Sequence, residues 1–302
     1  MNPTLLHYLS LLAPILFGIT ALFSWFERGL RPQRVKRLAL ISAWYSIAFA
    51  GIAAVAVIRQ GLLETPLMGW SGIGFSLRFD SVSMLMFGMI AIIGLIVFRF
   101  SFNYLDGDAR QGIFLGRLAA TLASVQLLVL SGNLGILLFS WVLTSISLHR
   151  LLIFYRERPG AVVAARKKFI VARLGDICLL ASVLVLYDLF GTGHLESIFD
   201  ALAGSTFAGE HSGALELAAV FLVAAALLKS AQFPTHGWLV EVMETPTPVS
   251  ALLHAGLLNA GPFLIIRMAY VLEASTSSSY ILLAFGGFTA LFGSVVFLTQ
   301  TS

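Results

Sequence analysis

Residues 224–238, "AAALLKSAQFPTHGW", place Lys229 at the end of a strongly apolar run and five residues before Pro234. The lysine lies about 15 residues into this run, which at roughly 1.5 Å per residue puts it beyond the middle of a bilayer. Pro234 removes a backbone donor, and Pro246 and Pro248 follow before a helix can resume, so the sequence predicts an interrupted transmembrane helix. Transporters commonly place ion sites at such breaks, and charges within a bilayer are rarely idle. Lys229 is therefore a candidate ion-translocation residue.

The charge of Lys229 needs a partner, because an ammonium group at the bilayer centre costs about 2.5 to 3.5 kcal/mol even on a lenient insertion scale. A different interpretation places the lysine near the cytoplasmic interface, where Pro234 simply ends the helix and Glu241 or Glu244 balances the charge. The residues alone leave both interpretations open.

The composition is that of an integral membrane protein. Of the 302 residues, 58% are hydrophobic and 11% are charged, whereas soluble domains average about 25% charged residues. Nine apolar segments approach the roughly 20 residues that a spanning helix needs. They are 4–26, 39–60, 81–104, 117–132, 134–155, 170–190, 214–233, 249–270 and 280–299. The sequence thus predicts an all-α polytopic membrane protein.

Basic residues predict the orientation of these spans. No Lys or Arg precedes the first span, which argues against a cleavable signal peptide. The basic residues that follow it are Arg28, Arg31, Arg34, Lys36 and Arg37. The loop at 156–169 is basic as well, whereas 191–213 contains no Lys or Arg, so the positive-inside rule places the amino terminus outside. A flipped topology is the alternative, and it would put two strongly basic loops outside.

The sequence shows no motif for chemistry of its own. The single cysteine, Cys178, excludes an internal disulfide and any cysteine-based metal site. The "GTGH" at 191–194 lacks the spacing and the strand-to-helix context of a dinucleotide site. We expect an ion-translocating transport subunit without a cofactor of its own, not an enzyme.

Three further polar residues lie inside predicted spans. Asp176 follows Arg173 by three residues, so it forms either a local ion pair near a helix end or part of an ion path. His149 shares a helix face with Ser145, four residues earlier, which gives that span a polar stripe. His254 lies in an apolar run, and an imidazole can relay protons because it both donates and accepts near neutral pH. All of these residues are candidates for the same ion path as the lysine.

One long run carries a resemblance to a known family. The segment "LLKSAQFPTHGWLVEVMETPTPVSALLHAGLLNAGPFLIIRM" (227–268) resembles the central signature of the antiporter-like subunits of respiratory complex I, of the subunit L type, and of Mrp sodium/proton antiporters. "FSLRFDSVSMLM" and "NLGILLFSW" also resemble family segments, so the resemblance extends from about residue 70 to the end. It implies an antiporter-like helix bundle with a broken transmembrane helix and a proton-carrying role for Lys229, and it aligns Asp176 and His254 with an aspartate and a histidine of the family.

The resemblance also divides the chain. Residues 1–116 would form amino-terminal transmembrane helices with an outer loop or hairpin near 70–80, because the segment 72–86 alternates apolar and polar residues. Residues 117–270 would form the first antiporter-like repeat, and 271–302 the start of a following helix. Since the family contains two inverted repeats, the chain is expected to hold only the first and to be incomplete relative to the family.

One departure from the family pattern concerns the partner of Lys229. The family normally reads Gly-Trp-Glu where this chain reads "SWVL", so Val142 stands where a lysine-pairing glutamate is expected. A nearby carboxylate stabilises a protonated lysine. We hypothesise that Asp176 or His149 takes over this role.

The region around Val142 resembles one particular branch of the family. Residues 140–176 resemble the DabB-type membrane subunits of two-subunit systems that accumulate inorganic carbon. The resemblance implies conduction of H⁺ or Na⁺ down its gradient across the bacterial inner membrane. It also implies a large DabA-type partner on the cytoplasmic side that contains zinc and handles carbon dioxide and bicarbonate. The polar loops most available to such a partner are 27–38, 105–116 and 156–169.

Two alternatives from other classes stay open. The first is a proton-translocating subunit of complex I or of an Mrp antiporter, against which Val142 argues. The second is a structural membrane anchor whose channel has decayed, against which the retained Lys229, Asp176 and broken helix argue. The choice between H⁺ and Na⁺ is open as well, because both ions can use a protonatable or oxygen-lined site.

Overall fold

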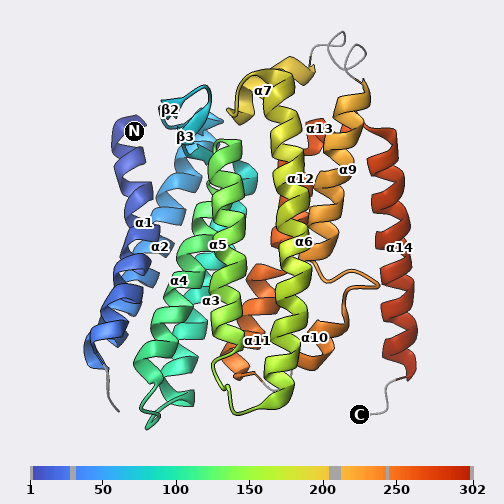
Figure 1. Cartoon of the computed structure of the whole chain (residues 1–302). Coiled ribbons are helices and arrows are strands. Elements are labelled where there is room, and N and C mark those ends of the chain that lie inside the picture. Colours follow the sequence, from blue (N-terminus) through green and yellow to red (C-terminus); the bar gives the residue numbers. More distant parts are fainter. Residues whose placement is uncertain (1–2, 28–31, 204–211, 243–244, 300–302) are drawn as a thin grey trace.

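The computed structural model describes residues 3–27, 32–203, 212–242 and 245–299 as a bundle of long helices that run side by side (Figure 1). Eight of the described helices are long and apolar enough to cross a membrane. They are α1 (Pro3–Phe26), α2 (Gln33–Gln60), α3 (Ser81–Tyr104), α4 (Gln111–Val129), α5 (Leu134–Leu152), α6 (Pro159–Phe190), α9 (Ser212–Lys229) and α14 (Thr276–Thr299). The prediction of an all-α polytopic membrane protein is confirmed.

The helix break after Lys229 is present. Pro234 lies in the turn that follows α9, and the chain continues in short pieces. These pieces are α10 (Gly237–Glu241), α11 (Thr247–Leu252), the π-helical turn η2 (Leu253–Leu257), α12 (Ala260–Arg267) and α13 (Ala269–Glu273). Pro246 precedes α11 and Pro248 lies in its first turn, where a missing N–H has no helical acceptor to lose. The predicted span at 249–270 is therefore helical in separate pieces and is not one of the eight continuous spans.

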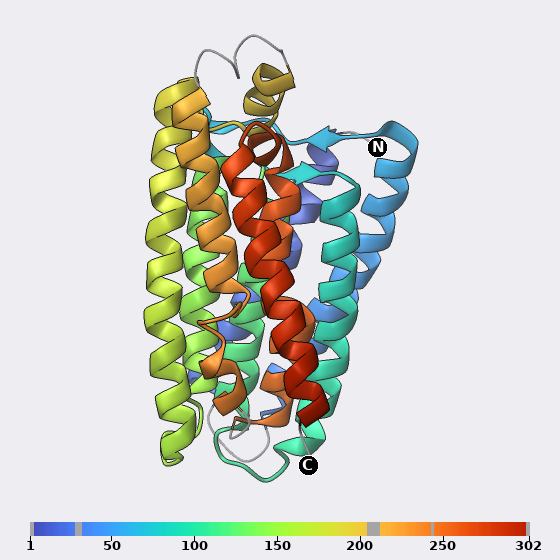
Figure 2. The same cartoon turned by 90° about the vertical axis from the view of Figure 1, so that its right-hand side faces the viewer.

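Two small antiparallel strand pairs lie between α2 and α3. They are β1 (Leu63–Glu64) with β4 (Arg78–Phe79), and β2 (Met68–Trp70) with β3 (Ile73–Phe75). Gly72 turns the second pair with a φ of 76°, a conformation that glycine adopts without steric penalty. The strands and α7 (Leu195–Ala203) lie at one end of the bundle, which we call the hairpin end (Figure 1, Figure 2). The other end, toward which α10 and α11 lie, we call the opposite end.

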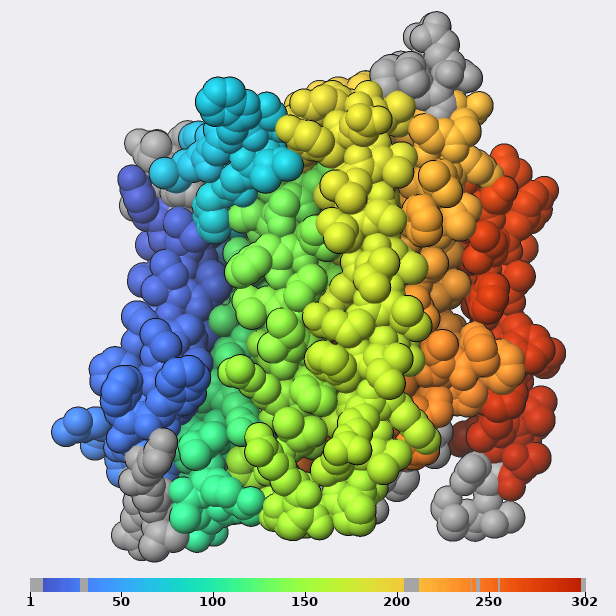
Figure 3. Space-filling model, in the orientation of Figure 1, coloured from blue at the N-terminus to red at the C-terminus, as the bar shows by residue number. Residues whose placement is uncertain are grey.

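Close helix approaches hold the bundle together. Gly116 of α4 packs so tightly on Ser24 of α1 that a Cβ at Gly116 would lie 1.8 Å from the Ser24 Oγ. Gln126 of α4 donates a buried hydrogen bond of 3.0 Å to Ser46 of α2. Small residues and shared polar contacts are the usual means of packing membrane helices. In contrast, α14 lies at the edge of the bundle in Figure 3, with Ser278 as its one buried residue.

Candidate ion-translocation site

Lys229 ends α9, and its ammonium group reaches across to α5. The Nζ atom donates hydrogen bonds to the backbone oxygen of Trp141 (3.0 Å), to Thr144 Oγ1 (2.9 Å) and to Ser145 Oγ (2.7 Å). It also lies 4.4 Å from the centroid of the Trp141 ring, within the range of a cation–π contact. An ammonium group has three donors, so each donor of Lys229 has an acceptor, and all three acceptors are uncharged.

The local structure of α5 positions these three acceptors and leaves their lone pairs free. Residues 141, 144 and 145 lie on one face of a helix because of its 3.6-residue period. The hydroxyls of Thr144 and Ser145 both donate to the Trp141 carbonyl, at 2.7 and 3.3 Å. Their protons are thereby used within the helix, which leaves oxygen lone pairs free to accept from Lys229. The polar stripe predicted through Ser145 thus forms the direct contact of the lysine.

Asp176 is the buried carboxylate of this site. It is 8% exposed, and its Oδ2 lies 2.6 Å from Nη2 of Arg173, so the local pair expected from their spacing is present. The charge of Asp176 also acts on Lys229, and its side chain lies beside Trp141. Within the described ranges neither carboxylate oxygen has a hydrogen bond of normal geometry, and Nε1 of Trp141 has none either. The carboxylate is therefore held by its ion pair with Arg173 and by its approach to Trp141.

Lys168 belongs to the site, and the sequence interpretation missed it. The basic loop predicted at 156–169 includes Lys168, but α6 begins at Pro159, well before the predicted span at 170–190. Lys168 is 5% exposed, and its Nζ donates a hydrogen bond of 3.0 Å to the Ser145 carbonyl. Lys168 and Asp176 are eight residues, or about two helical turns, apart and share the buried face of α6, which hydropathy alone does not show because it begins the span at 170.

The two predicted histidines lie away from the Lys229 ammonium contacts. His149 follows Ser145 by one turn of α5 and packs against Phe169 of α6, with ring centroids 4.8 Å apart. Its Nδ1 has no hydrogen-bond partner in the part of the chain that the structure describes. His254 lies in η2 with an exposed side chain. A relay role for either histidine stays a prediction.

The alternative interpretation, in which Glu241 or Glu244 balances the charge of Lys229 near the interface, requires one of these glutamates to pair with the lysine. Glu241 of α10 pairs with Lys167, at 2.5 Å between Oε1 and Nζ, and both side chains are exposed. Glu244 lies outside the described residues. The balancing of Lys229 by Glu241 is therefore wrong, because a more exposed lysine takes that carboxylate.

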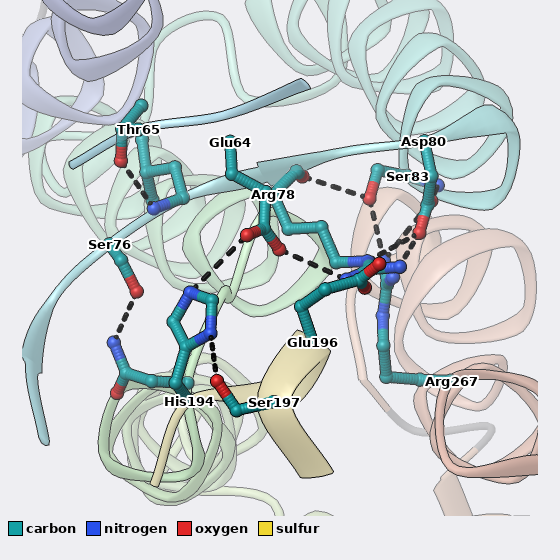
Figure 4. A network of polar contacts seen from close by, with 12 residues as sticks. Glu64, Thr65, Ser76, Arg78, Asp80, Ser83, His194, Glu196, Ser197 and Arg267 are labelled. Atoms are coloured by element: carbon teal, nitrogen blue, oxygen red, sulfur yellow. Dashed lines mark hydrogen bonds and ion pairs between the residues drawn. The ribbon is translucent and has the colours of Figure 1, made fainter. Parts of the chain in front are cut away.

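A second polar cluster lies at the hairpin end (Figure 4). Arg267 of α12 binds Asp80 and donates a hydrogen bond of 2.6 Å to Ser83. Arg78 of β4 binds Asp80 at 3.0 Å and also pairs with Glu64 and Glu196. Asp80 in turn caps α3 by accepting a 2.8 Å hydrogen bond from the Ser83 backbone. The cluster joins β1, β4, α3, α7 and α12, and its charges were not singled out from the sequence.

The pKa values of two carboxyl groups in this cluster are shifted in opposite directions. Burial would raise the pKa of Asp80, but the charge of Arg267 and hydrogen bonds from Ser83 and Arg78 lower it to about 2. Burial raises the pKa of Glu64, and the charges of His194 and Arg78 oppose that change only in part. His194 Nε2 lies 3.2 Å from the Glu64 carboxylate. Asp80 is thus the firmly ionised partner that ties α12 to the start of α3.

Replacing Arg267 with methionine is expected to lower the free energy of unfolding by about 3 kcal/mol, because it leaves the half-buried Asp80 short of a partner. An Asp80→Asn, Arg267→Met double variant should recover part of this loss, as a thermal unfolding series in detergent would measure. Arg110→Met, at an exposed pair with Glu157, is the matched control and should change stability by less than about 1 kcal/mol.

The same ion pair predicts a pH dependence. The folded-state pKa of Asp80 lies below its usual value, so its stabilisation, about 2 kcal/mol, is complete above about pH 4 and is lost as the pH falls toward 2. The stability difference between the parent protein and Arg267→Met should therefore shrink over that interval. A difference that stays constant down to pH 2 would contradict the assignment.

The broken helix, the lysine at its end and the eight apolar helices define an antiporter-type, multi-pass membrane subunit. Residues 131–302 match the family model described as NADH:quinone oxidoreductase/Mrp antiporter, TM, and residues 68–115 match NADH-Ubiquinone oxidoreductase (complex I), chain 5 N-terminus. The chain belongs to this NADH:quinone oxidoreductase/Mrp antiporter family, as its resemblance predicted.

Among curated proteins the chain is similar to DabB subunits. It is 36% identical over 294 residues to "Probable inorganic carbon transporter subunit DabB" of Hydrogenovibrio crunogenus, covering 97% of this chain and 54% of the relative. It is 38% identical over 269 residues to subunit DabB2 of Halothiobacillus neapolitanus, covering 86% and 48%. "NADH-ubiquinone oxidoreductase chain 5" of Acanthamoeba castellanii is 32% identical over 303 residues, covering 96% and 45%. The chain spans about half the length of these relatives.

Two solved structures share the fold. A chain of the membrane-bound sulfane sulfur reductase, an archaeal respiratory membrane complex, superposes with a TM-score of 0.81 at 18% identity, covering 99% of this chain and 60% of that chain. A chain of the Mrp complex from Dietzia sp. DQ12-45-1b gives a TM-score of 0.76 at 23% identity, covering 98% and 31%. These likenesses confirm the predicted antiporter-like helix bundle.

Proposed function

We propose that this chain is the ion-conducting membrane subunit of an inorganic-carbon uptake complex, with Lys229 as its proton carrier. The observation that carries the proposal is the ammonium group of Lys229, which meets three uncharged acceptors on α5 beside the buried carboxylate of Asp176. The similarity to DabB inorganic carbon transporter subunits supports the choice of substrate system.

The uncharged acceptors suit a lysine that must release its proton. If a carboxylate were the direct hydrogen-bond partner, deprotonation would leave a buried anion unpaired, which is costly. Here the release leaves two hydroxyls and a carbonyl, and none of these direct acceptors carries a charge that would be left unpaired. Asp176, whose charge acts on Lys229 and whose carboxylate also pairs with Arg173, supplies the stabilising charge that Val142 lacks. These contacts support Asp176 over His149 as the group that takes over from the glutamate expected at Val142.

The orientation and the docking face follow from charge. We place the amino terminus, and thus the hairpin end, on the outside of a bacterial inner membrane, because the basic loops gather at the opposite end. Two ion pairs join those loops into one surface: Lys36 lies 3.8 Å from Asp106, and Arg110 lies 3.2 Å from Glu157. On this surface a large, zinc-bearing DabA-type partner would dock from the cytoplasm and carry out the chemistry on carbon dioxide and bicarbonate.

A second candidate function is proton translocation within a quinone oxidoreductase or an Mrp antiporter. The match of residues 68–115 to the complex I chain 5 model favours it. The two candidates share the lysine, the broken helix and the choice between H⁺ and Na⁺. They differ in partner, in the direction of coupling and in the presence of a lysine-pairing glutamate, for which this chain has Val142.

Copurification separates the two functions. The full-length protein, purified from its native membrane in mild detergent, is expected to carry one large zinc-containing subunit and to restore growth at low carbon dioxide together with that subunit. An uncoupler should abolish the rescue, because uptake would be driven by the ion gradient. A set of quinone-oxidoreductase subunits in its place, or rescue that an uncoupler leaves intact, would contradict carbon uptake driven by this chain.

A further inference from the structure

Lys168 is a buried lysine that lies beside the half-buried Lys229. Its Nζ donates a hydrogen bond of 3.0 Å to the backbone oxygen of Ser145, and the hydroxyl of the same serine accepts a hydrogen bond of 2.7 Å from Lys229. One residue of α5 therefore bridges an amine from α6 and an amine from α9. Lys168 is 5% exposed, so its side chain does not reach the interface as basic residues near helix ends usually do.

The two lysines also line the same small cavity. Its volume is about 10 Å³, close to the space that one water molecule needs. The rest of its lining is mostly apolar and consists of Thr144, Leu148, Trp238, Leu253, Leu257 and Leu258. Because apolar walls lower the local dielectric, two ammonium groups facing this cavity would repel each other strongly.

The charges that face the pair do not offset two ammonium groups. Asp176 acts on both lysines, and Arg173 of the same helix adds a positive charge that also acts on both. His149 of α5 also faces Lys168, and when the imidazole is protonated its positive charge repels that of the lysine. On α10, the Glu241 carboxylate pairs with exposed Lys167 instead. Among the described residues, one carboxylate would thus face two ammonium groups and a guanidinium group, which favours one neutral lysine.

We propose that Lys168 is a second proton carrier that shares a single proton with Lys229, an inference that rests on the proposed ion conduction. In the transfer, the Lys168 ammonium gives its proton to the neutral amine of Lys229, so one N–H bond breaks, another forms and the charge of the pair is unchanged. The Ser145 carbonyl points along α5 toward Leu152 and the opposite end, as helix carbonyls do, so Lys168 is the carrier on that side.

The direct test is proton flux through the full-length protein in liposomes, measured with an entrapped pH dye under an imposed potential. Lys168→Met is expected to lower the flux by at least about tenfold. Lys168→Arg should lower it as much, because a guanidinium group keeps the charge and the hydrogen bond but does not release its proton. Arg59→Met, at an exposed basic residue in the last turn of α2, should conduct like the parent protein. Flux that Lys168→Arg restores would mean a structural role and would overturn the proposal.

A second measurement does not require transport. In protein labelled with ¹³C-lysine, the side-chain signal that disappears in Lys168→Met identifies Lys168 by NMR. Its titration midpoint should move to higher pH by about one unit or more in Lys229→Met, because a like charge has been removed. An unchanged midpoint would overturn the shared proton. If the parent protein conducts no protons, the proposed function fails, and this titration alone decides whether the lysines share one.

Discussion

Lys229→Met is expected to lower ion-coupled transport by about 100-fold or more, which is the scale at which a positioned proton-transfer group contributes. Methionine keeps the length and the apolar stem of lysine but removes the titratable amine. The variant should still fold, since the direct partners of the ammonium group are uncharged and Asp176 keeps its ion pair with Arg173. Proton flux in liposomes and growth at low carbon dioxide would measure the loss.

The control for this variant is Arg59→Met, which removes an exposed basic side chain in the last turn of α2. It should leave transport within about twofold of the parent protein, because Arg59 lies in α2, outside the helices α5, α6 and α9 that carry the site. Gel filtration and thermal unfolding of both variants would show that the fold is intact. Full transport by a well-folded Lys229→Met variant would show that Lys229 does not carry the ion. It would then favour the alternative of a structural membrane anchor.

Asp176→Asn should produce the second largest effect. The amide keeps the shape of the carboxylate but removes the one negative charge that acts on both Lys229 and Lys168 among the described residues. Protonation of the lysines then requires more acid, so the pH of half-maximal flux should fall by about one unit, with about tenfold less flux at neutral pH. The measurement is a series of flux assays across pH 5 to about 9.

Asp188→Asn is the control for this charge, since Asp188 is an exposed carboxylate on the same helix, α6. It should leave both the rate and the pH profile unchanged. If Asp176→Asn lowers the flux but does not move the profile, then Asp176 acts through its contact with Arg173, and the ion-pair interpretation of these two residues replaces the electrostatic one.

The sequence predicted the class of fold and three residues of the site, Lys229, Asp176 and Ser145, because those features depend on local sequence. Apolar runs of membrane length, the prolines after Lys229 and the three-residue spacing of Arg173 and Asp176 are all readable along the chain. The prediction of a continuous helix over the span 249–270 was wrong, because the π-helical turn at 253–257 divides it. Hydropathy does not report such a change in backbone hydrogen bonding.

Sequence alone determined that this is a multi-pass membrane protein with a lysine at a broken helix. Only the tertiary structure decided which groups surround that lysine. Lys168 looked like a loop charge because hydropathy started its helix at 170, and the buried face it shares with Asp176 became visible only once α6 was seen to begin at Pro159. The acceptors of Lys229 lie more than 80 residues away on α5, at Trp141, Thr144 and Ser145. No local pattern encodes such a contact, because it depends on how α5, α6 and α9 pack together.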